Sequence, residues 1–318
     1  MNKEEFENIN QAYNSIFKPN KLSIGLVVPI ESYINTPIPS MQDHIKKIQM
    51  VENLGFSAIW LRDIPFNVPS FGDVGQIYDP FVYLGLLSGL TKKIALGVAS
   101  IILPLRHPIH VAKAASSIDQ LSNGRLILGI ASGDRLEEYP ALNIPHETRG
   151  DRFRESFEYI NQVFKEFPVF KNQLGSSYGS IDMLPKPVSK KVPMLITGAS
   201  QQSPSWVASN GDGWITYPRD PKLQGKLIHN WREKSKDMGV KFAKPVSQSL
   251  YIDLVDDPNT KPKTIHLGYR LGSKYLIEHL KQLQEIGVNH VALNLRFNQM
   301  DIETTIKTLA DEVLSEFT

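Results

Sequence analysis

The sequence predicts an α/β fold, a TIM barrel of eight strands and eight helices, and three observations point to this class. Short apolar runs alternate with helical stripes eight times along the chain. A single barrel domain commonly reaches the length of this chain, 318 residues. The joints between a helix and the next strand repeat a glycine stop, at Leu54-Gly55, Asn123-Gly124, Asn210-Gly211 and Ile286-Gly287. We therefore expect one domain over residues 1–318, with a doubly wound open sheet as the competing topology.

Continuous apolar runs mark the strands, as is typical of a parallel sheet covered by helices. The first helix follows from Met41, Ile45, Ile48, Val51 and Leu54, which recur three or four residues apart. The expected strands are residues 23–28, 56–61, 94–103, 126–131, 194–197, 214–217, 249–254 and 288–293. The other helices are expected at residues 80–90, 108–121, 153–164, 203–209, 221–237, 274–286 and 302–313.

Helix starts have their own signals. Asp79 followed by Pro80 combines an N-cap with a first-turn proline, and Pro108 opens the third helix in the same way.

Two segments fall outside the repeating pattern. Residues 1–20 form an N-terminal extension, and residues 167–193 hold four prolines among short apolar stretches. We interpret the latter as an insertion after strand four that caps the barrel.

The composition excludes several classes of function. With 35 basic and 33 acidic residues the net charge is +2, which gives no field that favours nucleic acid or an anionic membrane as a partner. The chain has no cysteine, so disulfides, thiolate nucleophiles and cysteine-bound metals are excluded. The longest apolar run, residues 94–105, is too short to span a bilayer, and the N-terminus carries no signal region. We expect a cytoplasmic protein.

Common catalytic motifs do not fit this sequence. The run Gly129-Ile130-Ala131-Ser132-Gly133 lacks the serine position of a nucleophile elbow, and there is neither a dinucleotide fingerprint nor a phosphate loop of the NTPase kind. His107 and His110 are three residues apart, but no third metal ligand accompanies them, so we interpret them as surface residues of a helix start. His44, near the start of the first helix, is interpreted as solvated. A hydrolase barrel is therefore disfavoured.

The segment from Gly198 to Pro204 joins strand five to a helix and has the features of an anion site. It supplies free backbone N–H groups, the hydroxyls of Ser200 and Ser203, and a helix start. A capped helix with Ser200 or Ser203 as N-cap is the simpler alternative. Arg149 precedes another helix on the same face of the barrel, where active sites of this fold lie.

The end of strand two carries Trp60, Arg62 and Asp63. Charged side chains at the end of an otherwise apolar strand indicate a functional position, whereas Trp60 fits the core slightly better than a ring-stacking role.

Together these features resemble the bacterial luciferase-like flavin-dependent oxidoreductases over about residues 22–297. The most specific stretches are Leu54-Gly55-Phe56-Ser57-Ala58-Ile59-Trp60, Leu103-Pro104-Leu105-Arg106-His107-Pro108, Asp119-Gln120-Leu121-Ser122-Asn123-Gly124-Arg125, Leu128-Gly129-Ile130, Gly198-Ala199-Ser200 and Gly211-Asp212-Gly213-Trp214. Their order and spacing are specific to the family.

The resemblance implies FMN at the barrel mouth. Ala99 and Ser100 match the family's strand-three bulge, often a non-proline cis peptide, and Ala131, Ser132 and Gly133 match its strand-four end. The family's phosphate contacts fall on Arg149, Ala199, Ser200 and Ser203, and Gly198 belongs to the same signature.

One departure concerns strand two, where luciferases and several relatives carry a functional histidine and this chain has Arg62-Asp63-Ile64. We expect a monooxygenase that uses reduced FMN from a separate flavin reductase and dioxygen, with Arg62 or Asp63 positioning a small organic substrate. A dehydrogenase that uses the deazaflavin coenzyme and a flavin-binding protein without catalysis are the alternatives. The resemblance also implies a homodimer through helices two and three. Substrate choice depends on the loops at residues 63–79, 133–148 and 256–269.

Overall fold

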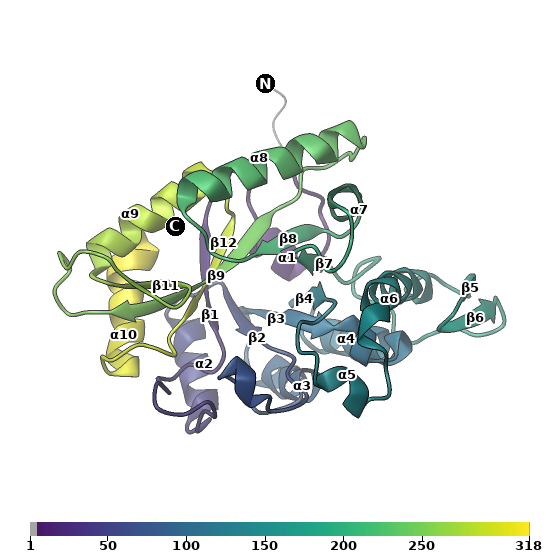
Figure 1. Ribbon diagram of the computed structural model, residues 1–318, viewed down its shortest axis with the longest axis horizontal. Coiled ribbons are helices and arrows are strands. Elements are labelled where there is room, and N and C mark those ends of the chain that lie inside the picture. Colours follow the sequence, from purple (N-terminus) through teal and green to yellow (C-terminus); the bar gives the residue numbers. More distant parts are fainter. Residues whose placement is uncertain (1–4, 318) are drawn as a thin grey trace.

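The computed structural model describes residues 5–317, and its centre is a closed barrel of parallel strands (Figure 1). Around the barrel the strand order is β1-β2-β3-β4-β7-β8-β9-β12, and β12 pairs with β1 to close the ring. This closure confirms the TIM barrel and excludes the doubly wound open sheet. The strands are β1 (Ser23–Val27), β2 (Ala58–Leu61), β3 (Ala95–Ile102), β4 (Leu126–Ala131), β7 (Met194–Thr197), β8 (Gly213–Thr216), β9 (Val246–Leu254) and β12 (His290–Asn294).

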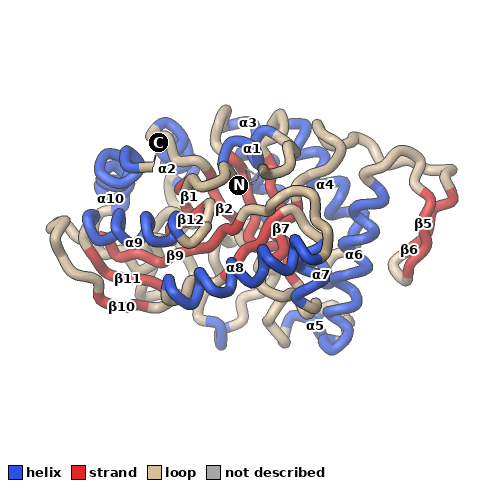
Figure 2. The backbone as a smooth tube through the Cα atoms, turned by 90° about the horizontal axis from the view of Figure 1, so that it is seen from above, coloured by secondary structure: helices blue, strands red, loops and turns tan. Residues whose placement is uncertain are grey.

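Helices surround the barrel, as the view from above shows (Figure 2). The outer helices are α2 (His44–Asn53), α3 (Pro80–Leu90), α4 (Pro108–Leu121), α6 (Arg149–Val163), α7 (Pro204–Ser209), α8 (Pro221–Asp237), α9 (Ser273–Glu285) and α10 (Ile302–Thr308). The expected start signals act as predicted: the Asp79 carboxylate accepts hydrogen bonds from the N–H groups of Phe81 and Val82. Gly55 and Gly287 follow α2 and α9 with φ of 89° and 94°, which explains the glycine at these joints.

The N-terminal extension closes one end of the barrel. Residues 1–4 of it lie outside the described part of the chain. Helix α1 (Gln11–Ile16) buries Tyr13 and Ile16 against side chains that point into the barrel, such as Trp60 and Ile215. The Tyr13 hydroxyl donates a 2.7 Å hydrogen bond to the Asp212 carbonyl just before β8. The extension is therefore part of the fold's inner core.

Trp60 lies inside the barrel, as the core interpretation predicts. Its indole N–H donates to His290 Nε2 at 2.8 Å, and its ring occupies the space beside Gly97. A Cβ atom at residue 97 would stand 2.4 Å from Trp60 Cε3, so only glycine fits there. Burial lowers the pKa of His290 to about 3, which keeps this histidine neutral.

The segment at residues 167–193 is an insertion after β4, but the expectation that it caps the barrel is wrong. It contains the hairpin β5 (Val169–Asn172) and β6 (Gly175–Tyr178), which projects from the side of α4 and α6 (Figures 1 and 2). The Phe170 ring packs edge-on against Tyr159 of α6 at 4.7 Å, and Gln120 of α4 donates to the Lys186 carbonyl. The Tyr159 ring of α6 and the Gln120 amide of α4 thus hold the insertion outside the barrel.

A second hairpin was not expected from the sequence. Residues 256–269 were interpreted as a loop, yet they contain β10 (Lys263–Ile265) and part of β11 (Gly268–Leu271). Strand β11 pairs with β9 in parallel and extends the sheet beyond the barrel. Its turn brings His266 and Leu267 to the barrel mouth.

The interpretation of His44 as a solvated residue is also wrong. The imidazole is 4% exposed, its Nε2 accepts a 2.7 Å hydrogen bond from the Ile30 N–H, and its Nδ1 lies 3.1 Å from the Tyr83 hydroxyl. Burial lowers the pKa of His44 to about 4. The loop after β1 folds over the start of α2, which the sequence pattern does not reveal.

Candidate functional site

A cavity of about 500 Å³ opens at the carboxyl ends of the barrel strands. Each of the eight barrel strands contributes to its wall, together with the loops that follow β2, β4 and β7. This is the end of the barrel at which enzymes of this fold place their active sites. The cavity is therefore the candidate site.

Ten of the twelve residues predicted from the sequence line this cavity. They are Arg62, Asp63, Ala99, Ser100, Ala131, Ser132, Gly133, Gly198, Ala199 and Ser200. The other two, Arg149 and Ser203, lie outside the wall. Ser203 follows the wall residues Ser200 and Gln201 in the chain. Arg149 begins helix α6, which is hydrogen-bonded to the same loop.

The bulge in β3 and its cis peptide are confirmed. The peptide bond between Ala99 and Ser100 is cis, and the register against β4 shifts between Val98 and Ile101. The Ser100 hydroxyl is hydrogen-bonded to the Thr197 hydroxyl of β7. A Cβ at Gly129 would meet the Val98 carbonyl at 2.5 Å, so glycine in β4 makes room for this bulge.

The end of β4 turns sharply into the loop that lines the cavity. Gly133 has φ of 77°, and a Cβ there would stand 2.6 Å from Ile102 Cγ2. The Tyr139 hydroxyl donates a hydrogen bond to the Ser132 carbonyl and fixes the turn.

The loop after β7 presents unused backbone donors to the cavity. Gly198, Ser200 and Gln201 have positive φ values of 57°, 46° and 60°. Within residues 5–317, no hydrogen bond is recorded for the N–H groups of Ala199, Ser200 and Gln201. Successive free amides in this kind of conformation form a concave anion site. Ser203 plays the simpler role that the sequence allowed: its hydroxyl caps α7 by accepting from the Trp206 N–H at 3.2 Å.

Arg149 stands next to this loop at the start of α6. Gln202 Nε2 donates a 2.8 Å hydrogen bond to the Gly150 carbonyl, which ties the loop to the helix. Arg149 Nη1 donates to the His146 carbonyl at 3.1 Å, whereas its Nε is buried without a partner. An unused guanidinium N–H beside free amides suits an anionic group.

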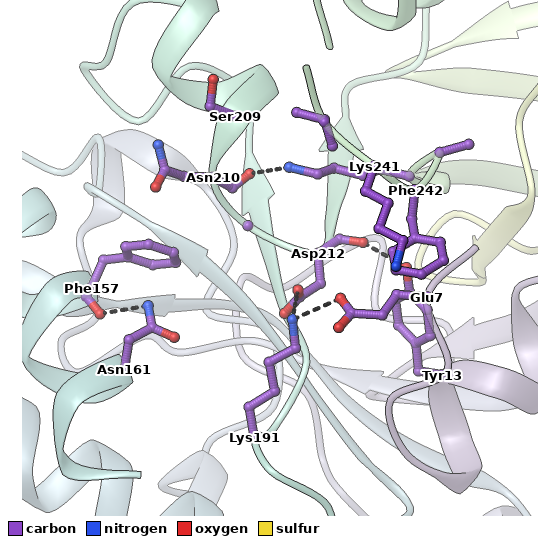
Figure 3. A pocket seen from close by; sticks show the side chains of 14 residues that line it. Glu7, Tyr13, Phe157, Asn161, Lys191, Ser209, Asn210, Asp212, Lys241 and Phe242 are labelled. Atoms are coloured by element: carbon purple, nitrogen blue, oxygen red, sulfur yellow. Dashed lines mark hydrogen bonds and ion pairs between the residues drawn. The ribbon is translucent and has the colours of Figure 1, made fainter. Parts of the chain in front are cut away.

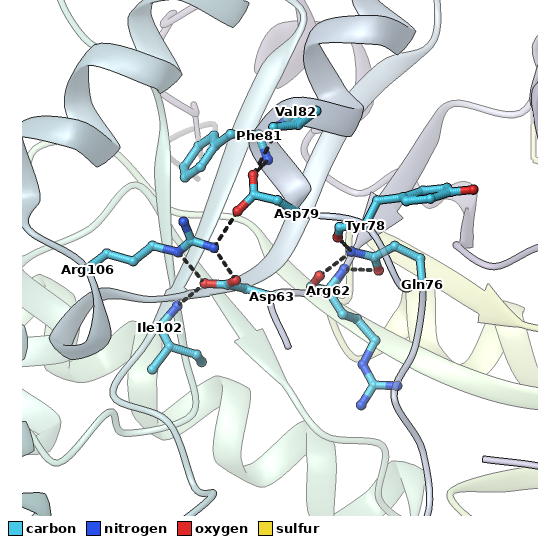
Figure 4. Close-up of polar contacts among 9 residues, drawn as sticks. All are labelled: Arg62, Asp63, Gln76, Tyr78, Asp79, Phe81, Val82, Ile102 and Arg106. Atoms are coloured by element: carbon cyan, nitrogen blue, oxygen red, sulfur yellow. Dashed lines mark hydrogen bonds and ion pairs between the residues drawn. The ribbon is translucent and has the colours of Figure 1, made fainter. Parts of the chain in front are cut away.

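Arg62 and Asp63 point in opposite directions from the end of β2 (Figure 4). Asp63 accepts from Arg106 Nε at 3.0 Å, from Arg106 Nη2 at 2.7 Å and from the Ile102 N–H at 3.1 Å. Both carboxylate oxygens are therefore engaged in joining the end of β2 to the last residue of β3 and to the segment that follows it. Arg106 also pairs with Asp79 at 2.8 Å, which links the same cluster to the start of α3.

Arg62 faces a second carboxylate. Its Nη1 lies 2.6 Å from Asp73, which also accepts from the Tyr33 hydroxyl and from the Gly75 N–H. Burial alone would raise the pKa of Asp73, but Arg62 and the Gly75 N–H hold that pKa below its ordinary value. Arg296, on the loop after β12, approaches the same carboxylate at 3.2 Å.

A smaller cavity of about 320 Å³ lies beside α1, at the amino ends of the strands (Figure 3). Lys191 bridges Glu7 at 2.9 Å and Asp212 at 2.6 Å across it. Lys244 Nζ donates to the carbonyls of Ala208 and Asn210. The polar groups of this smaller cavity pair with one another, which indicates a structural role for this end of the barrel.

A profile of luciferase-like monooxygenases matches residues 22–256. The chain belongs to this family. An alkanal monooxygenase beta chain of Photorhabdus luminescens is 31% identical over 230 residues, which cover 70% of this chain and 64% of that relative. The chain spans about half to two thirds of the length of the curated relatives it matches.

Solved structures share the fold of this luciferase-like chain. An F420-dependent secondary alcohol dehydrogenase in complex with an F420-acetone adduct has a TM-score of 0.76 and 17% identity, and covers 93% of this chain and 99% of that structure. A type II Baeyer-Villiger monooxygenase of Pseudomonas putida in complex with FMN has a TM-score of 0.74 and 15% identity, covering 94% and 99%. The first of these two proteins is F420-dependent, and the second was solved with FMN.

The structure of this luciferase-like chain places further residues in the site, which the sequence analysis did not identify. Among the described residues of the cavity wall, the histidine present is His266, from the turn between β10 and β11. Tyr251, Arg296 and Glu138 also line the wall, and Glu138 is 3% exposed. Burial raises the pKa of Glu138 to about 7, although Arg135 lowers it. No local pattern marks these residues, because they reach the cavity through tertiary contacts.

The described residues, 5–317, lack two further features that would point to a function. No group of three His, Asp or Glu side chains is arranged to hold a metal ion. No helix combines the length and the apolar character needed to cross a bilayer.

Proposed function

We propose that this protein is an FMN-dependent monooxygenase that uses reduced flavin and dioxygen on a small organic substrate. The observation that carries the proposal is the row of free amides at Ala199, Ser200 and Gln201 on the cavity wall. Arg149, whose Nε has no partner, begins the helix that is hydrogen-bonded to this loop through Gly150. These donors suit the phosphate of FMN. The choice of a monooxygenase over a dehydrogenase is supported by the match to the luciferase-like monooxygenase family and by the 31% identity with an alkanal monooxygenase chain.

The cavity suits a flavin in shape as well as in charge. Small residues line the ends of β3 and β4, where Ala99, Ala131 and Gly133 leave room for a flat ring. FMN, when bound, supplies the two-electron redox chemistry, and the protein binds, orients and shields it. We propose that Ser100 and Ser132 contact the ring and that Ser200, with Ser203 behind it, anchors the phosphate.

Arg62 is proposed to position the substrate, because its guanidinium extends along the cavity wall toward Asp73. Asp63 is proposed to act through Arg106, because its own oxygens are engaged. The Arg62→Ala variant is then expected to retain FMN and lose turnover. Equal turnover in the variant would remove Arg62 from the site.

Flavin fluorescence during titration of the apoprotein tests the proposal. The wild type is expected to bind FMN saturably, and the Ser200→Ala/Arg149→Ala double variant to bind it about ten- to hundredfold more weakly. That range follows from about 1.5–3 kcal/mol for a charge-assisted hydrogen bond. Ser205→Ala, in α7 and away from the cavity wall, is the control and is expected to leave the affinity unchanged.

Other outcomes favour the alternatives. If the wild type binds F420 and no FMN, the protein is a deazaflavin-dependent dehydrogenase. If it binds FMN but consumes no dioxygen with a flavin reductase, NADH and a broad substrate panel, it is a flavin-binding protein without catalysis.

We also propose that the protein forms a homodimer through α3 and α4, the second and third of the helices predicted from the sequence. Helix α3 is apolar on nearly all sides, which is typical of a buried helix. Yet Val82 is 74% and Leu86 49% exposed, and Gly85 and Gly89 lie on the same face of the helix. Small residues allow close approach of a second helix, and a second copy of α3 offers the matching surface.

A further inference from the structure

Glu138 differs from the other acidic residues of the cavity wall. The others are Asp63, Asp73 and Asp134. Asp63 and Asp73 accept hydrogen bonds from arginines and backbone N–H groups, and Asp134 is exposed to water. Glu138 is buried, and its Oε1 has no hydrogen-bond partner. Buried carboxylate oxygens are almost always paired, so an unpaired one on a cavity wall indicates a ligand contact.

Arg135, the nearest arginine, does not form a hydrogen bond with the Glu138 Oε1. Arg135 Nη1 is 3.8 Å from Glu138 Oε1, which is beyond hydrogen-bond distance. The Arg135 donors are used elsewhere: Nη1 faces the Phe66 carbonyl at 3.3 Å and Nη2 the Asp73 carbonyl at 2.9 Å. The guanidinium also lies over the Phe71 ring at 4.9 Å, which holds it in place.

The charges around Glu138 favour its protonated form near neutral pH. Burial raises its pKa to about 7, Arg135 lowers it, and the negative charges of Asp63 on β2 and Glu137 on the same turn raise it. The Phe66 N–H, from the loop after β2, lowers it. An acid or base is most effective when its pKa lies near the working pH.

We propose that Glu138 is the proton donor of this site. This inference rests on the proposed monooxygenase function. Its Oε1 contacts the bound reactants, and its proton goes to the oxygen atom that leaves as water. In the balanced reaction, anionic reduced FMN provides an electron pair and one proton and becomes FMN. One atom of dioxygen enters the substrate and the other becomes water, for which Glu138 provides the second proton. The resulting carboxylate recovers a proton from solvent.

The experiment compares wild type with Glu138→Gln, and Glu137→Gln serves as the matched control. Glu137 is the preceding residue, is exposed, and faces Ser70 instead of the cavity. Each protein is first titrated with FMN and is expected to bind it with wild-type affinity. Carboxyl-¹³C-labelled glutamate is then followed by NMR. One resonance is expected to titrate near pH 7 in wild type and at a slightly lower pH in Glu137→Gln, which loses a nearby negative charge, and to be absent from Glu138→Gln.

The second readout needs no substrate. Reduced FMN, bound to excess protein, is mixed with dioxygen in a stopped-flow instrument, and the return of oxidised flavin is followed from pH 5 to 9. Without substrate the reaction forms hydrogen peroxide and consumes the same proton. The wild-type rate is expected to fall as pH rises through about 7, because the protonated acid is the active form. Glu138→Gln is expected to be about 10²- to 10⁴-fold slower, with no pH dependence in this range.

The inference is overturned if Glu138→Gln keeps the wild-type rate and pH profile, or if Glu137→Gln slows the reaction equally. A Glu138 carboxyl that titrates at an ordinary pKa also overturns it. Failure of the wild type to bind FMN is a different result, which refutes the proposed function itself. If Glu138→Gln does not fold, Glu138→Asp withdraws the carboxyl from the cavity and is expected to give a slower rate with a pH profile shifted from wild type.

Discussion

The His44→Gln variant is expected to remove part of the acid sensitivity of the fold. His44 Nε2 accepts a hydrogen bond from the Ile30 N–H, so the folded protein requires the neutral imidazole. The pKa is about 4 in the folded state, against the ordinary value of 6.5 that applies to the unfolded chain. A glutamine oxygen can accept the same hydrogen bond without titrating.

The sign of the effect follows from proton binding. Because the folded pKa is lowered, the unfolded chain binds more protons between pH 6.5 and 4, and stability falls as pH falls through this window. The full difference of about 2.5 between the two pKa values corresponds to about 3.4 kcal/mol, at about 1.4 kcal/mol for each pKa unit. By pH 5 about 2 kcal/mol of this is already lost.

Urea unfolding at pH 7.5 and pH 5.0, followed by tryptophan fluorescence and circular dichroism together, measures this loss. Wild type is expected to lose about 2 kcal/mol more than His44→Gln between the two pH values. His229→Gln, at an exposed position of α8, is the control and is expected to behave as wild type. An equal loss in wild type and His44→Gln would refute the assignment of this buried, neutral imidazole.

Three further variants test other parts of the structure. Gly97→Ala is expected to cost about 1–3 kcal/mol of unfolding free energy and lower the Tm, because its Cβ would overlap Trp60; an unchanged Tm would contradict this packing. Arg106→Met leaves Asp63 buried without its cation and is expected to cost about 3 kcal/mol, measured by urea unfolding. If the Asp63→Asn/Arg106→Met double variant recovers none of this, the ion pair is not the cause. Val82→Asp/Leu86→Asp is expected to convert a dimer into a folded monomer in light scattering after size exclusion, and a monomeric wild type would refute the α3 interface.

The barrel could be predicted because its strands are buried on both faces. Such strands appear as continuous apolar runs, of which residues 126–131 match β4 at both ends. Strands β10 and β11 were missed because they are three and four residues long and mostly polar, as in Lys263 and Arg270. The pairing of β11 with β9 depends on a close approach of Gly268 to Tyr251, which no local pattern reveals.

The site could be predicted in part for a geometric reason. The carboxyl ends of parallel strands converge at one end of a barrel, so Ala99, Ala131 and Gly198 lie around one cavity although they are far apart in sequence. Glu138 could not be found in this way. Its burial depends on the loop after β2, which folds over α5 (Glu138–Ala141) and provides Phe66 and Asp63 as neighbours. The insertion was misplaced because its apolar residues, such as Phe170, indicate that it packs somewhere but not against which helix.

Helix α1 has a consequence for the order in which the chain folds. It precedes its partners by a long stretch of chain: the Tyr13 hydroxyl docks on the Asp212 carbonyl, 199 residues later, and the Glu5 carbonyl accepts from the Ala243 N–H. The first contact cannot form until the chain has been synthesised as far as Asp212, and the second until it has reached Ala243. The side chains of Tyr13, Ile16 and Phe17 cannot be buried until the interior of the barrel has formed. Contacts between residues so far apart in the sequence slow folding. The end of the barrel opposite the cavity therefore closes late, and we expect chains truncated before β8 to expose this helix to chaperones or to aggregation.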